Sequence, residues 1–555
     1  MKITYKRILS QGIYFALCGV LLIGNIDTFA TTATRIKPRV IATTDGELDD
    51  RSSMVRFLLY ACDYDIVGIV QVNGVQESGH SSEKWIEALI DKYDQCLSNL
   101  HIHNPDYPDK EYLLSVLKVG NENSADLGKA PPLIADNEGA QLIIKLLTDD
   151  DPRPVHILSW GGANTQANAL WQIKTNYPDK WPAAAAKARL YCIWYQDGGG
   201  LWIQKNLPEV KMYASCVTVD VNSLTYKNND DSWRYVWDYM SVDYYWKNRL
   251  SQNPKAIQTI MDKPWLAENI KVGHGSLAAA YSQEYTSEGD TPSFMPLVDN
   301  GLQQDTDYTL GGWGGRPISF SGLANIFVDG GDDNAGKTDY HYTFYRWLPA
   351  VQNDWAARAD WCVADDYSKA NHQPVAKVKG DLVRNVNPGQ TVTLDASESN
   401  DPDGNTLSYK WWQYFEVDNA TTKLTINNNT SMDNASFVVP DELNKQLHVM
   451  LEVTDNGIPV LTRYQRIIFN ISNEVAGLPV YASTDVSIYP NPVIDELKIS
   501  INNYSSIDCN MCLYDCQGVM ILNQKLTERE NVMNLRSIPK GIYFITINSI
   551  FFGGG

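Results

Sequence analysis

Residues 40–50 read VIATTDGELDD, an apolar run followed at once by a turn that holds Asp45, Glu47, Asp49 and Asp50. A helix-like apolar run comes next, so the stretch predicts a strand, an acidic turn and a helix. Carboxylates this close repel one another unless a hard cation or a raised pKa relieves the repulsion. We therefore expect Asp45, Asp49 and Asp50 to converge on one metal ion with oxygen ligands. The alternative is an acidic turn in which Asp49 or Asp50 caps the helix.

The amino-terminal residues 1–30 have the parts of a secretory signal, which are basic residues, an apolar stretch and small residues near Ala30. No later segment approaches the roughly 20 apolar residues that a membrane helix needs. We expect a secreted protein with no transmembrane segment in its mature form. The formal net charge of −20 argues against nucleic acid as a partner, because phosphate would be repelled. The nine cysteines are too widely spread for a disulfide scaffold, and their pairing stays open.

Strand-like and helix-like runs alternate from about residue 39 to residue 362. Strand patterns occupy residues 65–72, 155–159 and 189–194, and helical patterns occupy residues 138–147 and 165–173. This alternation predicts an α/β fold, with a mostly parallel open sheet covered by flanking helices, in a domain that we assign to residues 31–375. Functional sites in such sheets form at the carboxyl ends of the strands. Asp45 would lie at such an end.

The pattern changes after about residue 375 to short alternating runs separated by turn residues. Residues 376–475 are predicted to form an immunoglobulin-like β-sandwich, and residues 476–485 a linker. A second small β module is expected at residues 486–550. Asp401 and Asp403 lie in a turn of the sandwich, where they serve either as turn formers or as calcium ligands.

Several motifs carry a resemblance to a known family. The segment TTDGELDD (residues 43–50) resembles the aspartate motif of nucleoside hydrolases, with Thr43 where that family commonly has another aspartate. The segments GIVQVNG (68–74), SWGGANT (159–165) and EGDTP (288–292) are similar to further motifs of the nucleoside hydrolases. The segments QD (196–197), HGSL (274–277) and WGGR (313–316) resemble the branch described as the cellulose-binding, nucleoside-hydrolase-like domain family. The resemblance covers roughly residues 39–375 and implies the nucleoside-hydrolase-like fold.

The carboxyl-terminal modules also have likenesses. The stretch LDASESNDPDG (394–404) is similar to the turn of polycystic-kidney-type immunoglobulin-like modules. The stretches YPNPV (489–493) and IPKGIY (538–543) resemble the sorting module of type IX secretion. These likenesses imply a protein of a Bacteroidota-like bacterium that the type IX secretion machinery delivers to the cell surface or releases.

The resemblance implies a set of calcium ligands. In the family's pattern, Ca²⁺ would be held by Asp45, Asp50 and Asp290 together with the backbone carbonyl of Asn164. Asp49 would then bind a sugar hydroxyl. Calcium suits such a site because its six to eight oxygen ligands, as a rough range, tolerate mixed geometry and leave places for water and substrate.

The resemblance also implies a reaction. Asp45 would act as the general base for a water molecule that attacks the anomeric carbon, with inversion and without a covalent intermediate. His274 is the candidate donor to the leaving group, with a structural role in its loop as the alternative, and Asp197 is a second candidate donor.

Substrate contacts follow from the same likeness. Asn73 lies in the family's substrate-facing loop. The pocket would be lined by Trp202, Trp313 and Arg316, since tryptophan faces suit the apolar faces of sugars or bases.

Two functions are consistent with these features. The first is a secreted, calcium-dependent hydrolase of an N-glycosyl or related glycosidic bond, acting on a nucleoside or on a glycoside derived from plants or polysaccharides. The second is a non-catalytic protein that binds cellulose or another polysaccharide with the hydrolase-like fold. Thr43, the aromatic content and the appended sandwich favour the second function, whereas the retained aspartates favour the first.

Overall fold

The computed structural model describes residues 2–3, 14–15, 36–74, 79–214, 255–320, 325–472, 486–489, 495–501, 508–514, 520–536, 538 and 542–550. The chain divides into two compact units. One unit is residues 35–474, and the other joins residues 1–34 to residues 475–555. Most of the expected signal segment, residues 1–30, lies outside the described residues. Within the described ranges, no helix has the length and apolar composition that a membrane crossing requires.

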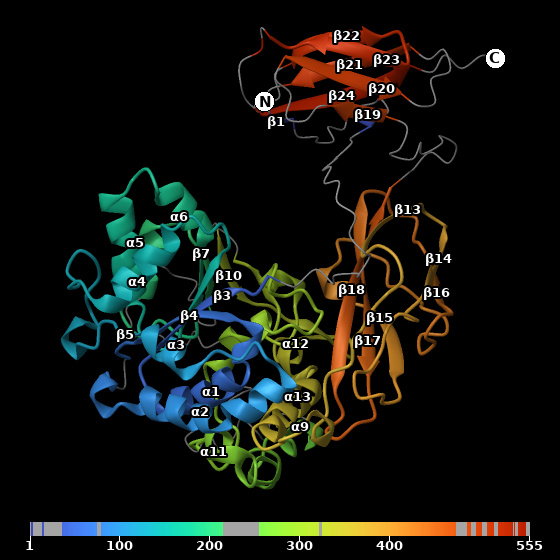
Figure 1. Ribbon diagram of the computed structural model, residues 1–555. Coiled ribbons are helices and arrows are strands. Elements are labelled where there is room, and N and C mark those ends of the chain that lie inside the picture. Colours follow the sequence, from blue (N-terminus) through green and yellow to red (C-terminus); the bar gives the residue numbers. More distant parts are fainter. Residues whose placement is uncertain are drawn as a thin grey trace. The chain divides into compact units, whose positions relative to one another are not determined.

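The larger unit is built on an eight-stranded sheet, which confirms the predicted α/β fold (Figure 1). All neighbouring strands are parallel except the edge pair β9 and β10. In spatial order the strands are β5 (Leu117–Val119), β4 (Asp65–Gln71), β3 (Arg39–Thr44), β6 (Val155–Ser159), β7 (Ala188–Cys192), β8 (Lys211–Ala214), β10 (Ile326–Asp329) and β9 (Pro317–Ser319).

Helices cover both faces of this sheet because its central strands are apolar on both sides. In β3, Val40 and Ala42 join one hydrophobic core, whereas Ile41 joins the other. The first core includes residues of α1 (Leu48–Leu59), α2 (Trp85–His103), α9 (Lys255–Gln258), α10 (Lys263–Leu266), α11 (Gly275–Ala279), α12 (Tyr342–Tyr345) and α13 (Leu348–Trp361), with α3 (Lys110–Ser115) beside α2. The second core includes residues of α4 (Glu138–Leu147), α5 (Asn164–Asn176), α6 (Trp181–Lys187) and α7 (Gly198–Asn206).

The strand order reverses at β3. The chain passes from β3 outward to β4 and β5, and then returns to place β6 on the other side of β3. Crossover connections on the two sides of such a point leave a crevice beyond the carboxyl ends of the strands. Here those ends are followed by the acidic turn after β3 and the glycine-rich turn after β6.

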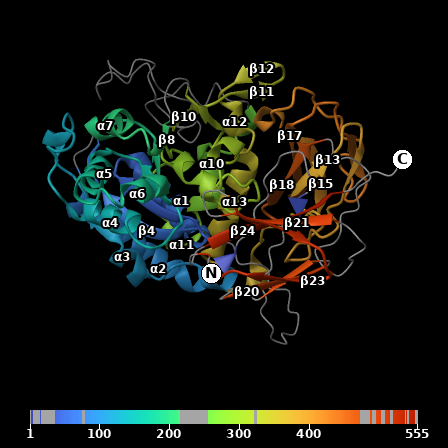
Figure 2. The ribbon, with the colours of Figure 1, turned by 90° about the horizontal axis from the view of Figure 1, so that it is seen from above.

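The predicted β-sandwich follows within the same unit. Its sheets are β13 (Val383–Val386), β18 (Thr462–Ile471), β17 (Lys445–Thr454) and β15 (Ser408–Gln413), and β14 (Thr391–Leu394) with β16 (Ala435–Val438). Strand β18 lies next to α13 (Figures 1 and 2), where Arg463 and Asp354 form an ion pair at 2.8 Å. Arg466 is fully buried and donates to the carbonyls of Leu302 and Leu310. The sandwich is therefore joined to the α/β domain by buried polar contacts.

The second unit is a small β module with its own hydrophobic core. One sheet contains β19 (Val486–Tyr489), β20 (Glu496–Ile501) and β23 (Glu530–Asn534). The other contains β24 (Ile542–Ile550), β21 (Asp508–Tyr514) and β22 (Met520–Leu526), and the short strands β1 (Lys2–Ile3) and β2 (Tyr14–Phe15) pair with β24. These small sheets confirm the prediction of a further β module after the sandwich.

Candidate functional site

The acidic turn between β3 and α1 is organised around Asp50. Its Oδ1 accepts hydrogen bonds from the Thr44 hydroxyl and from the backbone N–H groups of Asp45 (3.1 Å) and Gly46 (3.4 Å). Burial raises the pKa of Asp50, and the hydrogen bond from Thr44 opposes that rise. The helix itself begins after Glu47, so Asp50 holds the turn and does not cap the helix.

Asp290 reaches the same place from a distant segment. It immediately precedes the short turn η7 (Thr291–Ser293), and its carbonyl accepts a hydrogen bond from the Ser293 hydroxyl (2.6 Å). Its near neighbour Glu288 forms a fully buried ion pair with Arg56 of α1 at 2.6 Å. This pair ties the Asp290 segment to the helix that carries Asp49 and Asp50.

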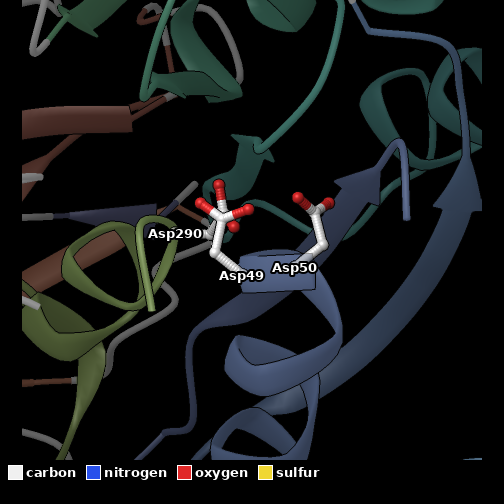
Figure 3. A group of neighbouring side chains, drawn as sticks. All are labelled: Asp49, Asp50 and Asp290. Carbon is white, nitrogen blue, oxygen red and sulfur yellow. The ribbon is translucent and has the colours of Figure 1, made fainter. Parts of the chain in front are cut away.

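Three carboxylates meet as a result. Asp49, Asp50 and Asp290 each offer an oxygen, and these oxygens all lie within 4.8 Å of one another (Figure 3). We call Asp49, Asp50 and Asp290 the acidic cluster. In Figure 3, Asp49 and Asp50 project from the first turn of α1, and the Asp49 side chain is drawn next to Asp290. An all-oxygen donor set of this kind matches a hard cation such as calcium.

Asp45 lies beside the cluster in a tightly enclosed position. It is 1% exposed, its Oδ1 accepts from the Glu47 N–H (3.2 Å), and its Oδ2 has no hydrogen-bond partner among the described residues. A Cβ on Gly74 would stand 1.7 Å from that Oδ2, and a Cβ on Gly161 2.9 Å from it. The turns after β4 and β6 can approach Asp45 this closely only because they carry glycine there.

Burial and mutual repulsion both oppose the negative charges of this group. Burial raises the pKa of Asp290 well above its usual value, and the charges of Asp50, Asp49 and Asp45 raise it further. The pKa of Asp45 is raised in the same way, first by burial and then by Asp50 and Glu47. Asp290 Oδ2, like Asp45 Oδ2, is buried without a hydrogen-bond partner among the described residues. These two oxygens, one on Asp290 of the cluster and one on Asp45 beside it, fit a bound cation, because a cation would satisfy both and reduce the repulsion.

Polar residues at the ends of the neighbouring strands form a wall next to Asp45. The Asn73 carbonyl accepts from the Gly162 N–H (2.7 Å), and the Asn73 side chain donates to Asn123. Asp197 caps α7 and accepts N–H bonds from Ala163 (3.0 Å), Asn164 (2.9 Å) and Gly199 (2.8 Å). Burial raises the pKa of Asp197 to about 6, although these N–H groups oppose the rise. Asn164 is the first residue of α5, so its backbone carbonyl points along the helix axis, toward the carboxyl-terminal end of α5.

Comparison with known families decides what this fold is. Residues 39–316 match the family model described as cellulose-binding Sde182, nucleoside hydrolase-like domain. A solved structure, described as a nucleoside hydrolase-related hypothetical protein from Saccharophagus degradans that is associated with carbohydrate metabolism, is 31% identical. The match covers 79% of this chain and 100% of that one, with a TM-score of 0.63. The chain belongs to the Sde182 family.

The remaining modules of this Sde182-family protein match family models as well. Residues 391–471 match the C-terminal domain of cellulose-binding protein Sde0182. Residues 487–550 match a secretion system C-terminal sorting domain, which directs the protein through type IX secretion to the cell surface or beyond.

Other solved structures are far more distant. The type III effector XopQ complexed with adenosine diphosphate ribose is 10% identical over 60% of this chain and 95% of its own, with a TM-score of 0.26. Dimeric latent PorU from Porphyromonas gingivalis is 16% identical over 34% of this chain and 20% of its own, with a TM-score of 0.13. A comparison with curated proteins gives no match.

His274 lies away from the acidic cluster of this Sde182-family protein. Its Nδ1 is 2.9 Å from Asp360, its Nε2 contacts the Glu268 carbonyl at 2.8 Å, and the contact with Asp360 raises its pKa. The next residue, Gly275, lies against Cys96 of α2, whereas Gly46 of the acidic turn lies against Trp85 at the start of α2. These two points on α2 are about 16 Å apart at the rise of an α-helix. The geometry therefore agrees with the structural alternative for His274.

Two more predicted pocket residues lie where the α/β domain meets the sandwich. Trp313 is fully buried beneath Arg463 of β18, and Arg316 binds Asp332 at 2.5 Å. Trp313 contacts the sandwich directly, whereas Arg316 is connected to it through Asp332, which accepts a hydrogen bond from Tyr414. Trp202 lies on α7, where it packs partly buried against the second hydrophobic core.

Gln196 is a site residue that the sequence reasoning missed. Its side-chain N–H donates to the Trp160 carbonyl (2.8 Å), and its Oε1 would stand 2.6 Å from a Cβ on Gly74. Gln196 therefore borders the same small space as Asp45 Oδ2. Its position directly before Asp197 was the feature of the sequence that could have indicated a place at the site.

Proposed function

We propose that the chain is a secreted, calcium-dependent hydrolase of an N-glycosyl or related glycosidic bond, acting on a nucleoside or on a glycoside derived from a plant or polysaccharide. One observation carries the proposal: carboxylates from distant segments meet at the carboxyl ends of parallel strands, and two of their buried oxygens lack a partner among the described residues. The main causes of the raised pKa values of Asp45 and Asp290 are burial and the neighbouring carboxylates, which a bound cation would offset.

Asp49, Asp50 and Asp290 would hold the ion, with Asp45 beside them. When bound, calcium would orient substrate hydroxyls and make a water molecule easier to deprotonate. Asp45 Oδ2 would accept the proton of the water that attacks the anomeric carbon, while the bond to the leaving group breaks and the leaving group takes up a proton, for which Asp197 is the remaining candidate donor. Asp197 and Asn73 would bound the substrate space from the neighbouring strand ends. His274 has no part in the proposed reaction, because it lies elsewhere.

Hydrolysis is tested with a panel of ribonucleosides and plant-derived glycosides, measuring released reducing sugar in the presence of calcium. Asp45→Asn should lower turnover by about 100-fold to 10,000-fold, the usual contribution of a general base. Chelation of calcium should abolish it. Asp136→Asn, at an exposed aspartate outside the site, is the matched control. Absence of turnover on every member of the panel, with calcium present, would overturn the proposal.

A second candidate function is binding of a polysaccharide without catalysis. The matched family model is described as cellulose-binding. The position of a further aspartate in nucleoside hydrolases is held here by Thr43, whose hydroxyl donates to the Leu158 carbonyl (3.1 Å) and accepts from Gln166 (2.8 Å). Thr43 is thus part of a buried network of uncharged hydrogen-bonding groups, and it adds no charge to the site. Retention of the full chain on insoluble cellulose, unchanged in Asp45→Ala, is the expected result, and no retention excludes this function.

A further inference from the structure

A separate pocket opens between the α/β domain and the β-sandwich. It has a volume of about 340 Å³, within the range of small-molecule sites. One wall comes from the hairpin of β11 (Asp332–Asn334) and β12 (Lys337–Asp339) together with α12, and the other from β15 and the segment after it. None of its lining residues belongs to the acidic cluster or to the wall around Asp45.

Aromatic side chains on both walls give the pocket flat apolar surfaces. Tyr342 comes from α12, whereas Trp412 and Phe415 come from the sandwich, and all three remain partly exposed. The guanidinium carbon of Arg346 lies 4.8 Å from the ring centres of both Tyr342 and Trp412. This cation–π contact fixes the two rings relative to each other. Rings held in this way can stack on the apolar face of a sugar without losing much side-chain freedom.

The polar lining is balanced in charge. Two acids, Asp333 and Glu416, and two bases, Arg346 and Lys423, face the pocket. Lys423 pairs with Asp333 at 2.7 Å, and the Asp333 N–H donates to Glu416 at 3.0 Å. A pocket without a surplus of either sign gives little attraction to an ionic ligand. It offers both donors and acceptors, which suits a neutral ligand rich in hydroxyl groups.

The two walls are locked together below the pocket by Asp332. This fully buried carboxylate accepts from Arg316 (2.5 Å) and Arg346 (3.3 Å) and from the hydroxyl of Tyr414 in the sandwich (2.9 Å). Separating the walls would remove the Tyr414 hydroxyl from this buried carboxylate and would also break the Lys423–Asp333 pair and the hydrogen bond from the Asp333 N–H to Glu416, which is costly. The pocket is therefore formed before any ligand arrives. Its rim is open at Lys423 and Asn429, both exposed, so that a longer chain can extend into solvent.

We propose that this pocket is a binding site for a neutral oligosaccharide, with sugar rings against Trp412 and Phe415 and hydroxyl groups on the charged lining residues. The inference rests on the saccharide-binding part of the proposed function, for which it names the site. It is independent of hydrolysis, because the acidic cluster contributes nothing to the pocket.

The experiment titrates the full chain with cellohexaose, a soluble β-1,4-glucan fragment, in excess chelator, and follows tryptophan fluorescence and binding heat. Trp412→Ala and Phe415→Ala should each weaken binding about tenfold, the effect of losing one aromatic contact. Tyr177→Ala, at an exposed ring on the far end of α5, is the matched control and should leave binding unchanged.

The variant Lys423→Ala distinguishes a loss of binding from a loss of folding. The Lys423 side chain is 60% exposed, and exposed ion pairs contribute little to stability, so this variant should fold normally and still bind several-fold more weakly. If cellohexaose binds equally to the native chain and to all three pocket variants, the pocket is excluded while saccharide binding stands. If neither cellohexaose nor insoluble cellulose is bound, the inference and the binding function fail together, and hydrolysis is unaffected.

Discussion

The carboxylates of Asp50 and Asp290 offer oxygens within 4.8 Å of each other, although one lies in the first turn of α1 and the other in a loop far along the chain. Close approach of two buried acids is unfavourable unless something compensates, and the Arg56–Glu288 ion pair holds the two segments together at this point. The fold thus maintains a concentration of negative charge that a cation would neutralise.

Calcium should stabilise the folded protein through this cluster. A ligand that binds only the folded state raises the free energy of unfolding by about 2.7 kcal/mol when its free concentration is about 100 times its Kd. Thermal unfolding with calcium and with chelator should show this rise. Asp290→Asn should lose the calcium-dependent rise, because it removes one ligand. The same variant should melt at or above the native temperature in chelator, because it also relieves repulsion.

The control for this measurement is Asp136→Asn, which removes an exposed aspartate and should keep the full calcium effect. A native protein whose melting temperature is the same with calcium and with chelator would contradict a calcium site at the cluster.

The Arg56–Glu288 pair should be essential for both stability and the site. Both side chains are fully buried, so Glu288→Gln leaves the Arg56 charge without its counter-ion and should cost about 3–5 kcal/mol in the free energy of unfolding. The calcium-dependent rise should weaken as well, since Asp290 follows Glu288 closely. Denaturant unfolding measures the first effect. Asp365→Asn, which breaks an exposed pair with Lys369, should change neither quantity.

Much of the fold was readable from local sequence. The helical pattern at residues 138–147 corresponds to α4, and the apolar run at residues 155–159 corresponds to β6, because burial on one face or on both leaves a periodic signal. The sandwich strands were equally clear from their alternation. The strand order, with β3 between β4 and β6, follows from packing over long distances and leaves no such local trace.

The candidate site was predicted in part. The acidic turn was evident from composition, and the approach of Asp290 was implied by a family likeness. Trp313 and Arg316 were predicted to line the pocket, but they lie at the contact with the sandwich, and no local pattern distinguishes the two roles. The sequence around His274, which lies between two glycines, was consistent with a catalytic or a structural role, and its contact with Asp360 on α13 and its distance from the acidic turn along α2 favour the structural role.

Acid should weaken the contact between the α/β domain and the sandwich through Asp354. Burial alone would raise the pKa of Asp354, but Arg463 and Arg358 outweigh burial and hold it well below its usual value. A carboxyl with a depressed folded-state pKa contributes stability that is present above its unfolded pKa of about 3.9 and is lost as the pH falls toward the folded value.

Asp354→Asn should therefore cost about 3–5 kcal/mol at neutral pH, because the buried guanidinium group of Arg463 loses its counter-ion and that of Arg358 keeps only its pair with Asp63. The difference from the native protein should shrink as the pH falls below about 4. Denaturant unfolding at a series of pH values measures this. Asp106→Asn, at an exposed pair with Lys37, is the comparison. A difference that stays constant across the acid range would show that Asp354 is not held in its charged form.

Cys96 and Cys362 should form a disulfide under oxidising conditions. A Cβ on Gly275 would lie 3.0 Å from Cys96 Sγ and 2.9 Å from Cys362 Cβ, so both side chains border one small space. A hydrogen bond from Cys362 lowers the pKa of Cys96 to about 5, which favours the reactive thiolate. Exchange with an added small-molecule disulfide, which is reduced to two thiols, should link Cys96 to Cys362 and raise stability by about 2–4 kcal/mol.

Peptide mapping without reduction should find the linked peptide. Cys192 is the internal control, because burial raises its pKa to about 12 and it should stay a free thiol. Recovery of Cys96 and Cys362 only as separate peptides carrying the reagent would contradict this pairing.

The absence of a side chain at Gly74 should be as important for turnover as the carboxylates of the site. A methyl group there would overlap Asp45 Oδ2 at 1.7 Å and crowd Gln196 Oε1 at 2.6 Å, so Gly74→Ala must displace the Asp45 carboxylate. A displacement of about 1 Å can cost about 100-fold in rate, and we expect a loss of that size in turnover of any glycoside that the native protein cleaves. Gly139→Ala is the matched control, since its methyl group would crowd Val70 in the hydrophobic core at 2.4 Å and not Asp45. Gly139→Ala should lower the melting temperature and leave turnover near the native value. An equal loss of turnover in both variants would show that general destabilisation, and not the position of Asp45, explains the loss.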